Sequence, residues 1–151
     1  MSLKISIEEI IPETVYQETV YEQVVIGKTI DGTRFGMFDY DMHVPPNSIG
    51  ETLEICINLF IPRERVTTTD RQVKGVQPNE NNPDGWSDHE FYGELTSLEE
   101  ISQSSYECEI DVGVGTVSIK SYKNLNQHLS VGDFVELEAS RTDIAGLVRD
   151  N

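Results

Sequence analysis

The chain contains almost no alanine and alternates apolar with polar residues over long stretches, which restricts it to β structure. Of its 151 residues only Ala139 and Ala145 are alanine, although alanine is the strongest helix former. Val, Ile, Thr, Tyr and Phe, which favour strands, supply most of the apolar positions. Because side chains on a strand point alternately to opposite faces, this alternation places one apolar face against a core. The sequence therefore predicts a mostly β protein.

Three segments show the alternation most clearly. The alternate residues that we expect to face the core are Leu53, Ile55, Ile57, Leu59 and Ile61; Tyr106, Cys108, Ile110 and Val112; and Val135, Leu137 and Ala139. Residues 91–102 predict a further strand, and Gly113 to Gly115 predict a turn or bulge before the strand that begins near Thr116.

The first half of the chain is less regular. Residues 22–44 read as a hairpin with Asp31-Gly32 as its turn, and its returning strand places Phe38, Tyr40, Met42 and Val44 on one side. The opening segment favours a strand because Leu3, Ile5 and Ile7 alternate, whereas Tyr16, Val20 and Val24 would suit a short helical stripe.

Residues 63–90 separate the two halves. They are polar, show little periodicity and contain prolines and glycines, which predicts one long loop that is either functional or a tolerated insertion. We therefore expect residues 1–151 to form a single domain, a Greek-key β-barrel or sandwich of about seven strands with a long loop at 63–90.

The charge of the chain limits its partners. Eleven Lys and Arg face 27 Asp and Glu, which gives a net charge of −16 at pH 7. The acids are spread along the chain, so nucleic-acid backbones and anionic membranes are not expected ligands. Solubility, high-salt adaptation or a basic partner protein would each suit this charge. The sequence shows neither an apolar span nor a signal peptide, so we expect a cytoplasmic protein with no membrane association.

The second half, from "FYGELTSLEE" through "YECEIDVGVGTVSIKS" to "VGDFVELEAS", resembles part of an OB-fold over residues 90–142. The resemblance implies a small closed Greek-key barrel, and members of that family often bind single-stranded nucleic acid through aromatic and basic side chains. The outward positions here are mostly Glu and Asp, with Lys120 and Lys123 as exceptions. Only the architecture is therefore implied for this chain.

The stretch "GMFDYDMHVPP" places Asp39, Asp41 and His43 at every second position. On an extended strand they would point the same way, either as ligands of a divalent metal or as the solvated face of an ordinary strand. The flanking Phe38, Tyr40 and Met42 supply an apolar face, so the solvated strand is the interpretation that we prefer.

The long loop carries the candidate binding residues. Trp86, the only tryptophan, either folds back over the barrel or is an exposed contact residue. Asp84, Asp88, His89 and Glu90 surround it but lack the spacing of an EF-hand, which leaves a loose calcium site as an alternative. Four basic residues either pair with strand-face carboxylates or form a local partner or anion site: Arg63, Arg65, Arg71 and Lys74.

No catalytic signature occurs in the chain, and Cys56 and Cys108 are expected to be free thiols. We expect a non-enzymatic protein without a cofactor that recognises a basic protein surface. The alternatives are an OB-type single-stranded nucleic-acid binder and a metal-dependent enzyme using Asp39, Asp41 and His43. Exposed strand edges would also be compatible with a homodimer.

Overall fold

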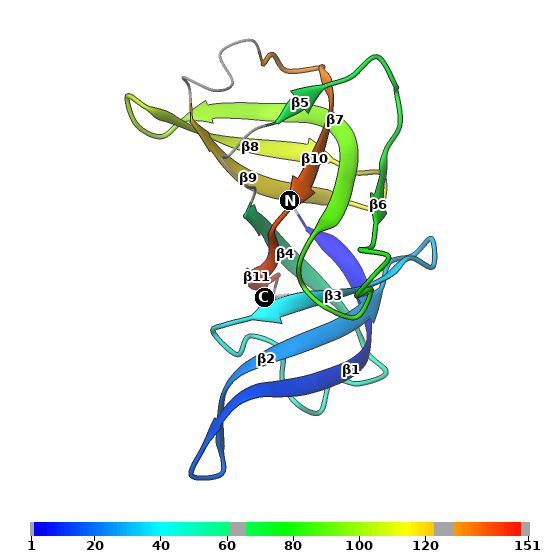
Figure 1. Ribbon diagram of the computed structural model, residues 1–151, viewed down its shortest axis with the longest axis vertical. Coiled ribbons are helices and arrows are strands. Elements are labelled where there is room, and N and C mark those ends of the chain that lie inside the picture. The colour runs from blue at the N-terminus through cyan, green and yellow to red at the C-terminus, as the bar shows by residue number, and fades with distance from the viewer. Residues whose placement is uncertain (1, 61–65, 123–128, 149–151) are drawn as a thin grey trace.

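The computed structural model describes residues 2–60, 66–122 and 129–148, and these residues form strands and loops without a helix. The eleven strands are β1 (Leu3–Tyr16), β2 (Thr19–Lys28), β3 (Arg34–Asp39), β4 (Thr52–Phe60), β5 (Thr67–Thr68), β6 (Gly75–Gln77), β7 (His89–Glu100), β8 (Ser105–Asp111), β9 (Thr116–Tyr122), β10 (Phe134–Ala139) and β11 (Arg141–Leu147) (Figure 1). The mostly β fold is confirmed. The structure has more strands than the expected seven or so because β5 and β6 are too short to show a period, and the sequence pattern did not indicate β11.

Five strands close into a barrel in the order β1-β2-β3-β11-β4, with β4 pairing back onto β1. All of these pairs are antiparallel except β3 and β11, which meet in parallel at Phe38 and Asp143. The hydrogen-bonded ring therefore joins β1 to β4, from the start of the sequence, to β11, the last of the described strands. This barrel is compatible with a small OB-like barrel.

The strands β5 to β10, which come between β4 and β11 in the sequence, form an added sheet. Its order is β9-β8-β7-β10-β5, with β6 beside β7, and it joins the barrel where β9 pairs in parallel with β4. The expected OB-like barrel was placed at residues 90–142, but most of that segment builds the added sheet and only its end enters the barrel. Alternation identifies a strand without identifying its neighbour, which is why this placement was wrong.

One core runs through the barrel and the added sheet. The alternation predicted its members well, because Ile55, Ile57, Leu59, Cys108, Ile110, Val112, Val135, Leu137 and Ala139 are all buried. Leu53 and Tyr106 are partly buried against the same core, and Ile61 lies outside the described residues. The opening segment is a strand, as we expected, with Leu3, Ile5 and Ile7 buried.

The hairpin turn between β2 and β3 is confirmed at Asp31-Gly32. Gly32 has a φ of 88°, which favours glycine. The Asp31 carboxylate accepts hydrogen bonds from the Thr29 hydroxyl and from the Thr33 N–H. The Thr29 hydrogen bond lowers the pKa of Asp31.

The expected faces of β3 are reversed. Phe35, Met37 and Asp39 point inward and are buried, whereas Phe38 is half-buried and Tyr40 is 62% exposed. The strand ends at Asp39, whose carboxylate accepts hydrogen bonds from the Gln23 side chain and from the N–H groups of His43 and Val44, each at 2.9 Å. Asp39 therefore holds the turn that follows β3 and is not part of a solvated face shared with Asp41 and His43.

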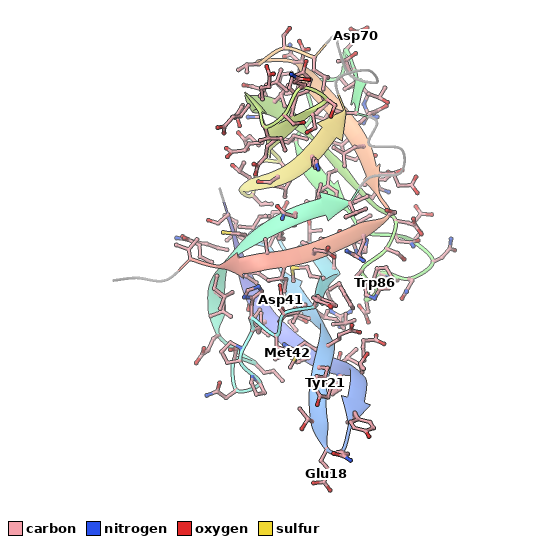
Figure 2. All side chains as sticks on the ribbon, turned by 90° about the vertical axis from the view of Figure 1, so that its left-hand side faces the viewer. Glu18, Tyr21, Asp41, Met42, Asp70 and Trp86 are labelled. Atoms are coloured by element: carbon pink, nitrogen blue, oxygen red, sulfur yellow. The ribbon has the colours of Figure 1, made fainter. Side chains whose placement is uncertain are left out.

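The 63–90 segment contains β5, β6 and a loop at residues 78–88 that covers the outer face of β3. Trp86 packs on Phe38 with 5.5 Å between ring centroids, and its carbonyl accepts the N–H of Thr142. Trp86 thus folds back over the barrel (Figure 2). Gly36 makes this approach feasible, because a Cβ there would collide with the carbonyl oxygens of Asp84 and Gly85.

His89 fastens this loop to the barrel. The side chain is fully buried, with its ring edge-on to Phe35 at 5.7 Å. Its Nδ1 accepts the N–H of Asn79 at 2.9 Å, and its Nε2–H faces the carbonyl oxygens of Gly85 at 2.8 Å and Gly36 at 3.2 Å. These partners fix a neutral imidazole, and burial lowers the pKa of His89 from its ordinary value of 6.5.

Replacing Asp39 should test its role in the turn. The change Asp39→Ala leaves the N–H groups of His43 and Val44 without their acceptor and removes one of the two acceptors of the Gln23 amide, which keeps the Val44 carbonyl. We expect it to lower the free energy of unfolding by about 2–4 kcal/mol. Asp41→Ala, at an exposed position, should change that free energy by less than about 0.5 kcal/mol. Urea unfolding of both variants checks this, and equal effects would contradict the assignment.

The stability of the protein should depend on pH through His89. Below pH 6.5 the unfolded chain binds a proton on His89 that the folded chain does not, so stability present above 6.5 falls as the pH falls. The free energy of unfolding, measured in urea from about pH 8 to about pH 5, should show this loss in the wild type. In His89→Gln this loss should be absent, and identical pH profiles for the two proteins would contradict it.

Candidate functional site

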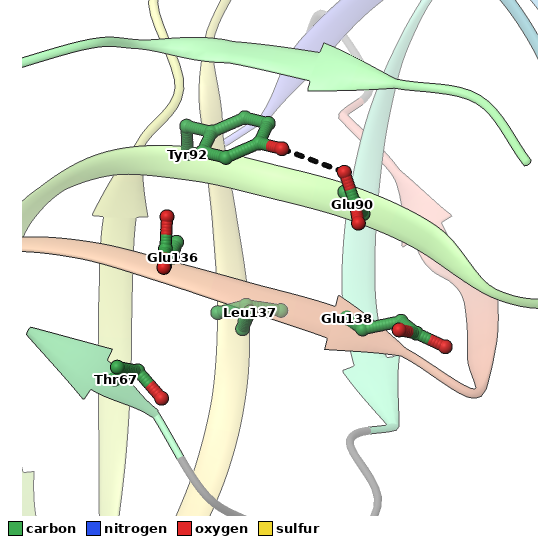
Figure 3. Close-up of a pocket in the computed structure, with 6 residues that line it drawn as sticks. All are labelled: Thr67, Glu90, Tyr92, Glu136, Leu137 and Glu138. Atoms are coloured by element: carbon green, nitrogen blue, oxygen red, sulfur yellow. Dashed lines mark hydrogen bonds between the residues drawn. The ribbon is translucent and has the colours of Figure 1, made fainter. Parts of the chain in front are cut away.

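The candidate site is a groove on the outer face of the added sheet. The strands β7 and β10 pair with Tyr92 opposite Glu136 and Glu90 opposite Glu138. Paired residues of antiparallel strands project to the same side, so these four side chains share one surface. The groove has a volume of about 340 Å³ and is lined by Thr67, Glu90, Tyr92, Glu136, Leu137 and Glu138 (Figure 3).

A tyrosine and an arginine organise one part of the groove. The Tyr92 hydroxyl donates to the Glu90 carboxylate at 2.6 Å. This hydrogen bond, followed by burial and the charges of Glu90 and Glu136, raises the pKa of Tyr92 to about 12, so the hydroxyl keeps its proton at neutral pH. The guanidinium carbon of Arg71 lies over the Tyr92 ring, 5.8 Å from its centroid. The tyrosine face therefore already accepts a guanidinium group.

The carboxylates of the groove continue into a neighbouring hollow. This second hollow, of about 470 Å³, shares Glu90 and Glu138 with the first and adds Glu80 and Asp88. Among the residues that the structure describes, none of these carboxylates or Glu136 forms an ion pair. We call the surface formed by both hollows the acidic groove.

The acidic groove suits cation binding. Glu90 and Glu138 are directly opposite each other on neighbouring strands, an arrangement of like charges that costs stability. An arginine or lysine side chain placed between them would relieve this repulsion and would find the hydrogen-bond acceptors that it requires. The ring of Tyr92 would add a cation–π contact.

The structure separates the candidate binding residues of the long loop. Arg71 borders the acidic groove, whereas Trp86 lies on the barrel against Phe38. Lys74 donates to the Asp111 carboxylate at 2.8 Å, which raises the pKa of Lys74 and lowers that of Asp111. Arg63 and Arg65 lie outside the described residues.

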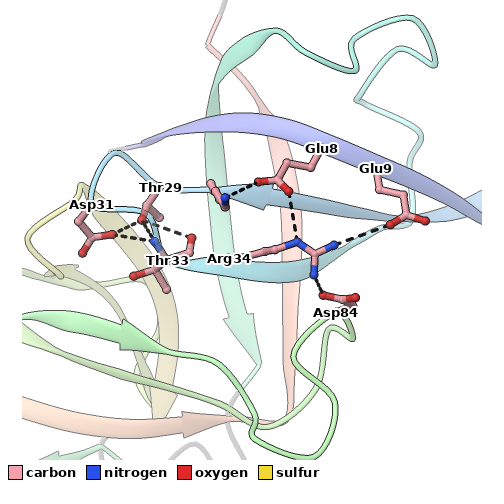
Figure 4. Close-up of polar contacts among 8 residues, drawn as sticks. Glu8, Glu9, Thr29, Asp31, Thr33, Arg34 and Asp84 are labelled. Atoms are coloured by element: carbon pink, nitrogen blue, oxygen red, sulfur yellow. Dashed lines mark hydrogen bonds and ion pairs between the residues drawn. The ribbon is translucent and has the colours of Figure 1, made fainter.

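Other basic side chains also bind carboxylates. Arg34, on β3, contacts Glu8 and Glu9 of β1 and Asp84 of the 78–88 loop (Figure 4). Arg141 binds Asp143 through two hydrogen bonds of 2.7 and 2.9 Å, and its guanidinium also lies over the rings of Phe38 and Phe60. For the basic residues of the long loop we considered pairing with carboxylates of the same chain or a role in a binding site. Lys74 pairs with a carboxylate, and other described basic side chains do the same.

The candidate metal ligands do not converge. Asp39 is buried in hydrogen bonds, and Asp41 lies at the surface with its carboxylate 3.8 Å from the His43 ring. The possible calcium ligands are also dispersed, because Asp84 binds Arg34 and His89 is buried under the 78–88 loop. Within residues 2–60, 66–122 and 129–148, no three His, Cys, Asp or Glu side chains are placed to hold a metal ion.

The cysteines occupy separate places as free thiols, in agreement with the sequence-based expectation. Cys108 is buried in the core, and burial followed by the charge of Glu107 raises the pKa of its thiol to about 11. Such a thiol carries almost no thiolate at neutral pH and is therefore a poor nucleophile.

Sequence reasoning named Arg71, which borders the acidic groove, as a binding residue, and named Asp88 and Glu90, which line it, only as possible calcium ligands. Glu90, Glu136 and Glu138 occupy outward positions of alternating segments, a pattern typical of any solvated strand. What distinguishes them from other solvated positions is the register of β7 against β10, which places Glu90 opposite Glu138. That register depends on pairing between residues far apart in the chain.

Comparison with known proteins assigns no family. No model of a known protein family matches the chain, and no curated protein matches it either. Among the described residues there is also no helix with the length and apolar character needed to cross a bilayer.

Proposed function

We propose that this protein is a non-enzymatic binding protein whose acidic groove accepts an arginine or lysine side chain from a basic partner protein. The observation that carries the proposal is the direct opposition of Glu90 and Glu138 beside Tyr92, with no ion pair to neutralise the two glutamates among the described residues. Arg71 supports it, because its guanidinium over the Tyr92 ring is an example of the kind of contact that a partner's arginine would make in the groove.

The charge of the whole chain supports the same partner class. A net charge of −16 would attract a basic protein at long range and accelerate their encounter. Salt screens such attraction over about 8–10 Å. The complex should therefore weaken as the ionic strength rises.

We also infer that the five-stranded barrel is OB-like, since its ring closes through a parallel pair between β3 and the last strand. In that class the face of the second and third strands usually holds oligonucleotides. Here the 78–88 loop and Trp86 cover the outer face of β3, and Arg34 and Arg141 beside it bind carboxylates. This arrangement favours a protein ligand over a nucleic acid.

Removing the opposed charges should weaken the binding of a basic ligand. We expect a short arginine peptide with blocked ends to shift the backbone NMR signals of Tyr92 and Glu90 in the wild type. In Glu90→Gln/Glu138→Gln the peptide affinity should fall by about tenfold or more.

The chain offers a matched control for this experiment. Glu99 and Glu107 also face each other, on β7 and β8, and are exposed but do not line the acidic groove. Glu99→Gln/Glu107→Gln removes the same charge and should leave peptide binding at the groove within about twofold of the wild type. If both double variants lost the same peptide affinity, the loss would come from the lower net charge alone, and this result would contradict a binding site at the groove.

Single-stranded nucleic acid should not bind this protein. We expect a fluorescently labelled oligonucleotide to keep its anisotropy in micromolar protein at low salt, because the described carboxylates on the outer strand faces repel phosphates. A clear anisotropy increase that disappears with added salt would instead favour the OB-type nucleic-acid binder.

A further inference from the structure

The hairpin of β1 and β2 extends beyond the barrel as a two-stranded arm, which we define as residues 11–22 (Figure 1). Strand β1 pairs with β4 only from Leu3 to Ser6, and β2 pairs with β3 only from Gln23 to Lys28. In the arm the two strands have only each other among the described elements. Isolated two-stranded hairpins are marginally stable in water, so an arm of this kind gains from a partner.

The arm exposes large apolar side chains. Val15 is 56% exposed, Tyr16 63% and Tyr21 53%, and Figure 2 shows Tyr21 on the arm with Glu18 at its tip. Exposed apolar patches on a folded protein mark interaction sites, and tyrosines are enriched among residues that dominate binding energy. The position of these residues on a projecting ribbon suits insertion into a cleft.

The charge of the arm identifies the kind of partner. Residues 11–22 contain Glu13, Glu18 and Glu22 and no Lys or Arg. A second copy of the chain would bring glutamates against glutamates, and a nucleic acid or anionic membrane would repel the arm as well. A protein cleft with an apolar floor and a rim of Lys and Arg complements both features.

The backbone of the arm indicates whether a partner would bind its strand edges or its side-chain faces. Pro12 lies within β1, and the pairing of β1 with β2 has register shifts between Pro12 and Thr14 and between Thr14 and Val15. Proline, irregular register and edge charges all hinder the addition of another strand. Binding should therefore use the side-chain faces of the arm.

We propose that the arm inserts its apolar side chains, chiefly Tyr16 and Tyr21, into a basic-rimmed apolar cleft of a partner protein. The proposal does not rest on the acidic groove, because the arm projects at the bottom of Figure 1, whereas the groove-bearing strands β7 and β10 lie in the upper half of the molecule. The arm is a second, separate contact surface.

Site-specific photocrosslinking tests this in two stages. The probe is the full chain with Tyr16→p-benzoylphenylalanine, irradiated in cells of the source organism, with Ile30→p-benzoylphenylalanine as the matched control. Ile30 is 77% exposed and lies in the turn between β2 and β3. We expect position 16, and not position 30, to capture a basic protein. Capture of only a second copy, an acidic protein or nothing at position 16 would overturn the proposal.

The captured protein is then purified and its affinity measured by calorimetry. Tyr16→Ser/Tyr21→Ser should weaken binding by about tenfold or more. Ile30→Ser/Ile49→Ser, which removes two other exposed apolar side chains, should stay within about twofold of the wild type. Equal affinity for the wild type and the tyrosine variant would overturn the proposal. Glu90→Gln/Glu138→Gln should retain arm binding, which separates this test from that of the groove.

Discussion

The pairing of β11 between β3 and β4 is the constraint on which the rest of the structure depends. It closes the five-stranded barrel, so the described strands β5 to β10, which come between β4 and β11 in the sequence, form an excursion from the barrel. The strand β10 leads into β11 through Ser140 alone. Closure of the ring therefore fixes where β10, and with it the added sheet, can lie.

Contacts between the added sheet, with its 78–88 loop, and the barrel stabilise this arrangement. The 78–88 loop returns to the barrel, where Trp86 packs on Phe38 and His89 contacts β3 through Gly36. Because His89 makes these hydrogen bonds as a neutral imidazole and burial lowers its pKa, protonation of His89 would weaken the contact between the 78–88 loop and the barrel. The same contacts cover the outer face of β3, so the partner recognition that we propose uses other surfaces.

Acidic residues divide into those that serve the fold and those that are available for recognition. Asp39 holds a turn from inside the barrel, and Glu8, Asp84 and Asp111 bind described cations. The carboxylates of the acidic groove have no such partners among the described residues. The groove and the arm present different chemistry, the first mainly charge and the second apolar side chains bordered by charge. They are the two surfaces through which we propose that the protein contacts basic partners.

The sequence by itself determined the β class, the inward residues of β4, β8 and β10, the Asp31-Gly32 turn and the acidic exterior, because each follows from local alternation, turn chemistry or composition. It misassigned the faces of β3, since Phe35 and Met37 alternate with Phe38 and Tyr40 and both faces look apolar. Only the tertiary structure decided that Asp39 is buried, that β11 closes the barrel and that Glu90 lies opposite Glu138. These features depend on which strands pair and in which register, and that choice is made by contacts between residues far apart in the chain.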